Sequence, residues 1–279
     1  MSRHFIFSVI IPHKNTPDLL ERCLRSIPRM EIIQIIVVDD NSNENIVDFE
    51  WMSNLNDECV EVYLTKEGKG AGYARNTGMR YAKGKWVIFA DSDDFFVEGA
   101  FEHLFAYMNS CEEIIYFKSA SFYSDTNAPA NRERKYNKLV DDYLANEKHS
   151  ADRLRYLWNV PWAKMIQKKL LDRSNILFDE IPVAEDLFFS CQLGHHAISI
   201  IAVDTVIYMI AVRFGSLTNI RSFKMYKIMW TVFNKRNVFL KKIGKKHIQP
   251  SLLKRLFHTT LGNERINRKS YQSKKYIGT

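Results

Sequence analysis

"KWVIFADSDDFFVEG", residues 85–99, joins a run of apolar side chains to a cluster of acids. Five of its first six residues are apolar, which is typical of a strand buried in a sheet. Asp91, Asp93 and Asp94 follow at once. Carboxylates this close repel one another, and burying them without a positive partner is costly. The stretch therefore predicts a buried strand that ends at a site for a positive charge.

Strand and helix patterns alternate along the first 120 residues. Strand patterns cover 5–12, 32–40, 60–64, 85–90 and 112–122, and helical patterns cover 16–27, 70–84 and 97–108. Thr16 is expected to cap the first helix, with Pro17 at its first position. The alternation predicts an α/β fold with a mostly parallel, doubly wound sheet flanked by helices. The polar residues 123–150 are expected to form a long loop or an excursion, after which helical and strand signals resume.

Composition and cysteine spacing narrow the class of protein. Of the 279 residues, 46% are hydrophobic and 26% charged, which is ordinary for a globular domain. No apolar stretch is long enough to span a bilayer, and the N-terminal run predicts a strand and not a signal peptide. The four cysteines lack C-x-x-C spacing, so reduced thiols in the cytosol are expected and a zinc site is not.

Charge is divided unevenly along the chain. Residues 213–279 hold 17 Lys and Arg against one acid, Glu264, a balance of about +16, whereas the preceding residues carry about −8. We expect residues 221–279 to form a basic amphipathic helical region. It admits three interpretations: solvated helix surface packed on the domain, nucleic-acid binding, or attachment to an anionic membrane surface. Interleaved aromatic residues favour lipid over nucleic acid, and packing on the domain stays an equal alternative.

Polar residues follow three of the predicted strands, at 12–15, 39–42 and 91–94. In an open parallel sheet, ligands bind beyond the carboxyl ends of the strands. One acid pair at a strand end is often only a turn or helix cap, but two pairs at one edge favour a ligand. Mg²⁺ and Mn²⁺ bind through one or two carboxylates together with substrate phosphates. The edge therefore predicts a divalent ion carrying a diphosphate.

Five segments together resemble one known family. They are "SVIIPHKN", "IIVVDDNS", "GAGYARNTG", "FADSDDFF" and "AEDLFF", and they occur in the order and at the spacings of family 2 glycosyltransferases. The resemblance covers about residues 5 to 220. It implies the GT-A nucleotide-diphospho-sugar transferase fold over 1–220, with a nucleotide-binding half of about 1–120 and an acceptor-side half of about 121–220. It also implies inversion of configuration at the sugar carbon.

The resemblance assigns nucleotide contacts to four residues. Pro12 would lie beside the nucleotide through its backbone, and Asp40 would accept a hydrogen bond from the base. Uracil offers the N–H donor that a carboxylate needs, although thymine and guanine do so too. Arg75 and Asn76 would brace the nucleotide or its phosphates. The alternative that Arg75 only pairs with a strand-end acid stays open.

The resemblance also assigns the metal and the general base. Asp93 would be the direct ligand of Mn²⁺ or Mg²⁺, with Asp91 an indirect ligand that also contacts the nucleotide, while Asp94 is expected to cap the next helix. Glu185 and Asp186 begin a helix, where they either cap it or supply the base that takes the acceptor proton. The family pattern places that base at Asp186.

Two further segments are expected on the acceptor and leaving-group sides. Trp162 would offer a flat face to a sugar ring and Lys164 would meet a phosphate, although a core tryptophan is equally compatible with the sequence. Arg213, with Ser216 and Thr218, would offset charge on the departing diphosphate.

The resemblance thus implies a metal-dependent inverting glycosyltransferase that moves a UDP-linked sugar to a hydroxyl of a saccharide or lipid-linked saccharide. The family implies a bacterial cell-surface polysaccharide and a cytoplasmic enzyme, peripheral at the inner face of the membrane. One alternative is a nucleotidyltransferase, but "PHKNTPD" lacks the glycine- and lysine-rich phosphate loop such enzymes carry after the first strand. The other is a non-catalytic nucleic-acid- or lipid-binding protein acting through its basic tail.

Overall fold

A computed structural model describes residues 4–213 and 222–249 and divides the chain into two compact units, 1–236 and 237–279. The first unit includes the first turns of α9 (Phe223–Lys242). Lys235 Nζ in this helix lies 2.7 Å from Asp179 Oδ1 of the same unit. In the second unit, Gly244 ends the helix with a left-handed φ of 73°, and the short helix η2 (Lys246–Ile248) follows.

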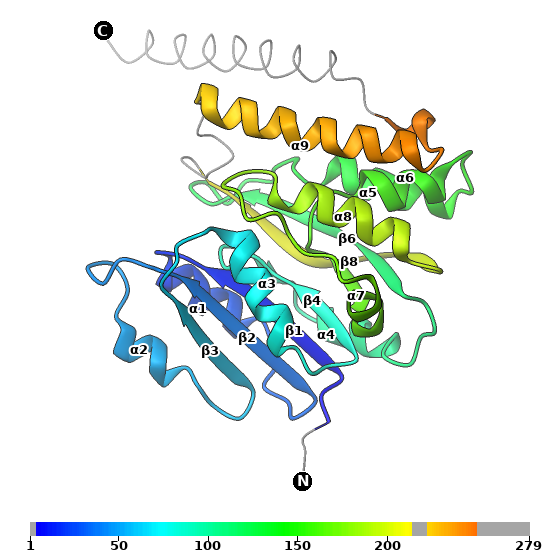
Figure 1. Cartoon of the computed structure of the whole chain (residues 1–279). Helices are drawn as coiled ribbons and strands as arrows, with labels where there is room; N and C mark the ends of the chain where they lie inside the picture. Colours follow the sequence, from blue (N-terminus) through cyan, green and yellow to red (C-terminus); the bar gives the residue numbers. More distant parts are fainter. Residues whose placement is uncertain (1–3, 214–221, 250–279) are drawn as a thin grey trace, which may run out of the picture. The chain divides into compact units, whose positions relative to one another are not determined.

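An eight-stranded sheet forms the centre of the first unit, in the order β3-β2-β1-β4-β7-β6-β8-β5 (Figure 1). The strands are β1 (Phe7–His13), β2 (Ile33–Asp40), β3 (Val60–Thr65), β4 (Trp86–Phe89), β5 (Phe95–Phe96), β6 (Ile114–Tyr123), β7 (Lys164–Gln167) and β8 (Ile200–Val212). Strands β1 to β4 run parallel, as expected. β7 is antiparallel to both β4 and β6, and β5 is antiparallel to β8, so the sheet is mixed.

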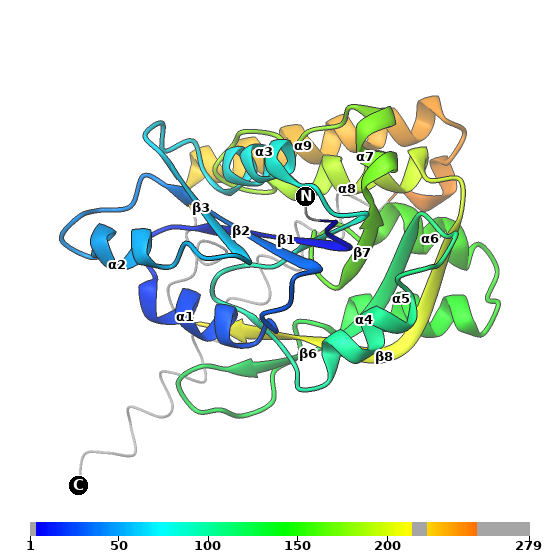
Figure 2. The same ribbon diagram turned by 90° about the horizontal axis from the view of Figure 1, so that it is seen from below.

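Helices cover both faces of the sheet. They are α1 (Pro17–Arg25), α2 (Phe49–Asn54), α3 (Ala71–Tyr81), α4 (Ala100–Ala106), α5 (Arg134–Leu144), α6 (Ser150–Leu157), α7 (Lys168–Ser174) and α8 (Glu185–His196), together with α9. Figure 2 shows α3 on one side of β1 and β2 and α1 on the other. α1 turns Leu20, Cys23 and Leu24 inward. All residues of β1 and β2 are buried, which explains their near-continuous apolar sequence.

The polar stretch 123–150 contains a helix that the sequence analysis does not predict. α5 buries Tyr136, Leu139 and Val140, which fall on one helical face. Charged neighbours dilute this pattern, so it is weak when the stretch is judged by polarity alone. The short elements β5, β7 and α2 are also absent from the sequence prediction. Pro17 occupies the first position of α1 as expected, but the Thr16 side chain makes no capping hydrogen bond.

All four cysteines are free, with Cys23 and Cys191 buried. Among the residues that the structure describes, no helix combines the length and the apolar character needed to cross a bilayer.

Candidate active site

Three parallel strands bring their polar ends to one edge of the sheet. His13 at the end of β1 pairs in register with Asp39 of β2, and Ile10 pairs with Phe89, the last residue of β4. Pro12 is buried within β1 opposite Val38. The D-x-D stretch therefore follows β4 at the edge where the two acids of β2 also end.

Asp39, the first acid of "VVDD", stabilises this edge and is not directed at a ligand. Its carboxylate lies 2.8 Å from His13 Nδ1 and accepts hydrogen bonds from the backbone N–H and hydroxyl of Ser42. Burial alone would raise the pKa of Asp39, but these hydrogen bonds outweigh it and hold the pKa below its usual value. Asp39 therefore stays ionised and fixes the turn after β2.

The two carboxylate oxygens of Asp40, the second acid, differ in their hydrogen bonding. Its Oδ2 accepts from the Gly70 backbone N–H at 2.9 Å and from Lys14 Nζ at 3.3 Å. Its Oδ1 is buried and has no hydrogen-bond partner among the described residues. A buried acceptor is normally satisfied, so this oxygen fits a donor supplied by a ligand, such as a base N–H.

The carboxylates of the D-x-D stretch form a cluster of the size that a metal ion needs. Oxygens of Asp91, Asp93 and Asp94 lie within 4.8 Å of one another. Asp91 Oδ1 lies 2.6 Å from Arg75, and Asp93 Oδ2 lies 2.6 Å from Arg213. Both of these acids are partly exposed and offer hard oxygen ligands, the donor set that Mg²⁺ and Mn²⁺ prefer.

Asp94 does not cap the next helix, and that expectation is wrong. α4 begins at Ala100, with Gly99 before it, whereas Asp94 is buried and its Oδ1 accepts the backbone N–H of Ala211 at 2.8 Å. Its carboxylate therefore anchors the end of β8 to the D-x-D stretch. Burial and the neighbouring acids Asp93 and Asp91 raise the pKa of Asp94.

Arg75 joins the two acidic motifs. Its side chain is 4% exposed, and it lies 2.6 Å from Asp91 and 2.9 Å from Glu185 Oε1 at the start of α8. The pairing with a strand-end acid, left open by the sequence, is thus present, and it links the D-x-D stretch to the "ED" pair. Asn76 instead binds the backbone of Phe178. Its side-chain amide N–H donates to the Phe178 carbonyl oxygen, and its amide oxygen accepts the Phe178 N–H. That occupies its polar atoms, so the nucleotide role expected for Asn76 gains no support.

Asp186 lies in the first turn of α8, half-buried beside Glu185. Burial raises the pKa of Asp186 to about 8, with Glu185 and Asp91 adding to the rise and Arg75 opposing it. A carboxylate with a pKa near the working pH is well matched to proton abstraction. Helix capping does not account for this placement, because Ala184 occupies the N-cap position and no side chain caps the helix.

Trp162 and Lys164, expected on the acceptor side, are both core residues. Trp162 is 2% exposed and stacks on Tyr208 with ring centroids 5.8 Å apart, so it offers no face to a sugar. Lys164 is 1% exposed, with Nζ 5.9 Å from the Tyr116 ring centroid, and is not placed to meet a phosphate from solvent. Burial lowers the pKa of Lys164 to about 7, against the opposing effect of Asp186.

Several residues at this edge escape the sequence analysis. Lys14 binds Asp40, Arg22 donates to the backbone oxygen of Asp93 at 2.5 Å, and the Tyr208 hydroxyl accepts the Asp91 N–H at 2.8 Å. Lys14 comes shortly after the first predicted strand, so its position in the sequence could have placed it at the ligand-binding edge of the sheet. No local sequence pattern indicates that Arg22 or Tyr208 lies at this edge. Ser216 and Thr218, expected beside Arg213, lie outside the described residues.

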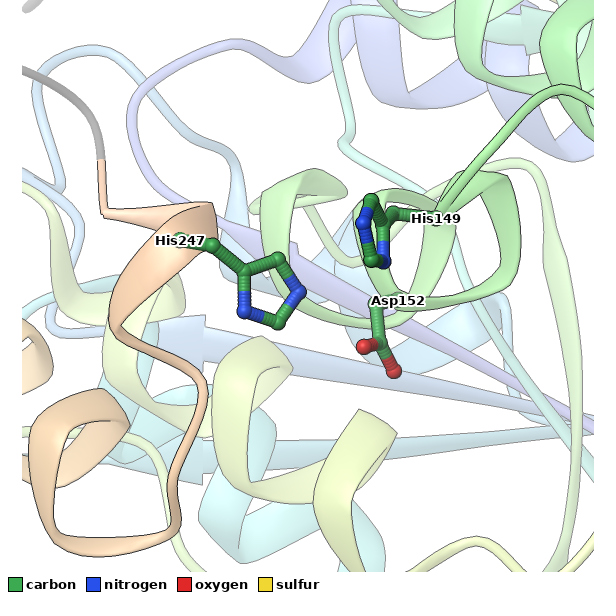
Figure 3. A group of neighbouring side chains, drawn as sticks. All are labelled: His149, Asp152 and His247. Atoms are coloured by element: carbon green, nitrogen blue, oxygen red, sulfur yellow. The ribbon is translucent and has the colours of Figure 1, made fainter.

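Two other features do not belong to this site. A cavity of about 500 Å³ opens at the opposite edge of the sheet, beside Phe5, Gly84 and Gln167, and no carboxylate lines it. His149 and Asp152 lie at the start of α6 (Figure 3), and His247, also labelled there, belongs to η2 of the second unit. Two ligand atoms in the first unit are fewer than a metal site normally takes, so we assign them no function.

The order of the sheet, with acids at the end of β2 and after β4 at one edge, is the arrangement of a GT-A fold. Residues 8–172 match the family model Glycosyl transferase family 2, and the chain belongs to this family. This is the family that the sequence analysis predicts.

Among proteins of similar sequence is the uncharacterized glycosyltransferase EpsJ of Bacillus subtilis (strain 168), 28% identical over 77% of this chain and 63% of EpsJ. Another is the poly(ribitol-phosphate) beta-N-acetylglucosaminyltransferase TarP of Staphylococcus aureus (strain N315), 27% identical over 66% of this chain and 56% of TarP. The chain thus spans about three fifths of these relatives.

Solved structures confirm the fold. S. aureus TarS 1–349 in complex with UDP-GlcNAc has a TM-score of 0.64 at 21% identity, covering 82% of this chain and 66% of TarS 1–349. The mannosyltransferase PcManGT of Pyrobaculum calidifontis, in complex with GDP-Man and Mn²⁺, has a TM-score of 0.56 at 18% identity, over 77% of this chain and 59% of that one. At such identities the likeness concerns the fold alone.

Proposed function

We propose that this glycosyltransferase is metal-dependent and inverting, with Asp93 and Asp91 as the metal-binding acids and Asp186 as the general base. The observation that carries the proposal is the bridge made by Arg75, which lies 2.6 Å from Asp91 and 2.9 Å from Glu185. One buried guanidinium thereby holds the diphosphate side and the base side of the site together. A divalent cation at the D-x-D acids would offset charge on the leaving diphosphate.

The residues of the chain divide the remaining tasks. The unpartnered Oδ1 of Asp40 accepts an N–H of the base, which fits uracil and disfavours adenine and cytosine. Pro12 packs beside the nucleotide, and Arg213 faces the diphosphate from the end of β8. Asp186 takes the proton of the acceptor hydroxyl as that oxygen attacks the sugar carbon. A single base without a carboxylate nucleophile is what a one-step inverting displacement requires.

The relatives suggest the substrates. TarS was crystallised with UDP-GlcNAc, and the name of TarP specifies transfer of N-acetylglucosamine to poly(ribitol-phosphate). We infer a UDP-sugar donor and a saccharide or polymer hydroxyl acceptor, in the synthesis of a bacterial cell-surface polysaccharide. Family membership places the chain among enzymes, which disfavours a non-catalytic nucleic-acid- or lipid-binding protein. The absence of a phosphate loop after β1 disfavours a nucleotidyltransferase.

A donor panel tests the proposal without knowledge of the acceptor. UDP-, GDP- and CMP-sugars are incubated with the full chain, with Mn²⁺, with Mg²⁺ and with EDTA, and release of the nucleotide is measured. We expect slow hydrolysis of a UDP-sugar that needs the metal and is lost in Asp93→Ala. Hydrolysis that persists in EDTA, or in Asp93→Ala, would refute the metal assignment.

A further inference from the structure

The two acids of the D-x-D motif are each held by an arginine. Asp91 Oδ1 lies 2.6 Å from Arg75 Nη2, and Asp93 Oδ2 lies 2.6 Å from Arg213 Nη2. The same two carboxylates belong to the cluster whose size suits a metal ion. A guanidinium and a divalent cation need the same oxygen lone pairs and repel each other. The arginines and the metal ion therefore compete for these acids.

The two arginines differ in their exposure to solvent. Arg75 is buried and has a second acid, Glu185, on its other side. The Arg213 side chain is 32% exposed and lies just beyond the end of β8. Ala211, two residues earlier, is fixed because its N–H is bound by the buried Asp94. The strand end is therefore held in place, and the Arg213 side chain is more open to solvent than that of Arg75.

We propose that Arg213 is an exchangeable occupant of the metal site. It holds Asp93 while no cation is bound, leaves when a divalent cation arrives, and then pairs with the diphosphate of the donor. The proposal rests on the proposed function for the metal site and the diphosphate donor. The cation and the nucleotide should therefore bind with positive coupling. The cation replaces Arg213 on Asp93, and the diphosphate of the nucleotide then gives Arg213 a new partner. Such couplings are typically about 5- to 150-fold.

Arg213→Gln tests the exchange, because it is expected to change two affinities in opposite directions. Without nucleotide, Mn²⁺ should bind the variant about fivefold more tightly or better, as measured by the paramagnetic resonance of free Mn²⁺. In saturating Mn²⁺, UDP should bind the same variant at least about fivefold more weakly by calorimetry. Damage to the fold would weaken both. Arg25→Gln is the matched control, since Arg25 is an exposed arginine of α1 paired with Glu21, and neither affinity should change.

Three results are decisive. Mn²⁺ binding to Arg213→Gln that equals or falls below that of the wild type overturns the exchange, and so does unchanged UDP binding. The variant Asp93→Asn examines the site itself. If it binds Mn²⁺ as tightly as the wild type, the metal assignment fails, and the proposed function falls for a reason separate from Arg213.

Discussion

Two neighbouring acids at the start of α8 have different surroundings. Glu185 is paired with Arg75, which is also bound to Asp91. Asp186 makes no ion pair within the described part of the chain, and its pKa is raised to about 8. A carboxylate engaged by a guanidinium is a poor proton acceptor, whereas an unpaired one with a raised pKa is a good one. The geometry therefore favours Asp186 over Glu185 as the base.

Asp186→Asn is expected to reduce turnover roughly 10²- to 10⁴-fold while the affinity for the donor stays near that of the wild type. The amide keeps the shape and removes the proton acceptor. Steady-state kinetics together with calorimetry of UDP binding measure the two effects. Glu185→Gln is the comparison, and we expect it to loosen Arg75 and affect donor affinity as well. Full activity in Asp186→Asn would move the role of base to another residue.

Lys164 gives a prediction about pH. Burial lowers its pKa to about 7 and Asp186 opposes that shift, so the partial charge of Lys164 favours the ionised form of Asp186. Arg75 acts in the same sense, whereas Glu185 and Asp91 raise the pKa of Asp186. Asp186 acts as a base only when ionised, so the rate rises with pH through its pKa. Lys164→Met removes this partial positive charge, so the acid limb of kcat/KM should move to higher pH.

Lys164→Arg is the comparison for that experiment, because it holds a positive charge at every working pH and should move the acid limb to lower pH. A purely structural role for Lys164 predicts a lower rate at every pH with no shift of the limb. The pKa of Asp186 can also be followed in the absence of substrate by carbon NMR of the labelled carboxylate, with Asp186→Asn providing the assignment.

Among the secondary-structure elements, those with uniform local patterns were the predictable ones. β1 and β2 are buried on both faces and read as unbroken apolar runs, and α3 opens at Gly70, whose φ is 94°. β7 has only four residues, and its antiparallel pairing depends on partners about 50 and 80 positions away. No local pattern specifies such a pairing, which is why β7 is absent from the sequence prediction.

The same division holds for the site. Asp40, Asp91 and Asp93 were predictable because a strand end fixes where their carboxylates lie. Trp162 and Lys164 were not, because the same residue types serve a binding surface or a core, and only packing decides which. Trp162 stacks on Tyr208, which is 46 positions away in the chain.

One close approach between helices gives a stability prediction. A Cβ added to Gly194 of α8 would lie 2.1 Å from the backbone oxygen of Arg155 in α6. Arg155 also donates to the backbone oxygens of Gly194 and Ala197, so the two helices cannot easily separate. Gly194→Ala should therefore cost about 1 to 3 kcal/mol and lower Tm by about 2 to 12 °C.

Calorimetric melting of the full chain measures this effect. Gln192→Ala, a half-buried position on the same helix, is the matched control and should melt close to the wild type. UDP binding by the Gly194→Ala variant at low temperature should be preserved, because the contact lies away from the sheet edge that carries the acids. A Tm equal to that of the wild type would mean that α6 and α8 are not packed as described.

At the scale of the whole chain, α9 has two unlike faces. Val232, Phe233 and Arg236 are buried, so this side is part of the folded protein. Phe223, Tyr226 and Trp230 are exposed at helical spacing, Phe223 by 88%, with Lys224 and Lys227 among them. The buried face thus supports packing on the domain, and the exposed face supports attachment to lipid. Packing accounts for one face, and a lipid surface fits the aromatic and basic character of the other.

We predict that this exposed face attaches the enzyme to anionic membrane. Each Lys or Arg near such a surface contributes about 1 kcal/mol, and salt weakens the attraction over about 10 Å at 0.1 M. The triple variant Phe223→Ser, Tyr226→Ser and Trp230→Ser should lose sedimentation with anionic liposomes. Leu144→Ser, an exposed apolar residue of α5, should not. Equal sedimentation with neutral liposomes, or none with either kind, would eliminate the lipid interpretation.

The insertion of β7 between β4 and β6 has a consequence for biosynthesis. β4 consists of Trp86–Phe89, all buried, and its second neighbour in the sheet begins only at Lys164. A ribosome adding 5 to 20 residues per second needs roughly 4 to 15 s to cover that interval. During this time the nascent chain presents an apolar strand with one free edge. We expect chaperone dependence to be greatest in that window, and chains stalled before Lys164 to aggregate where full-length chains do not.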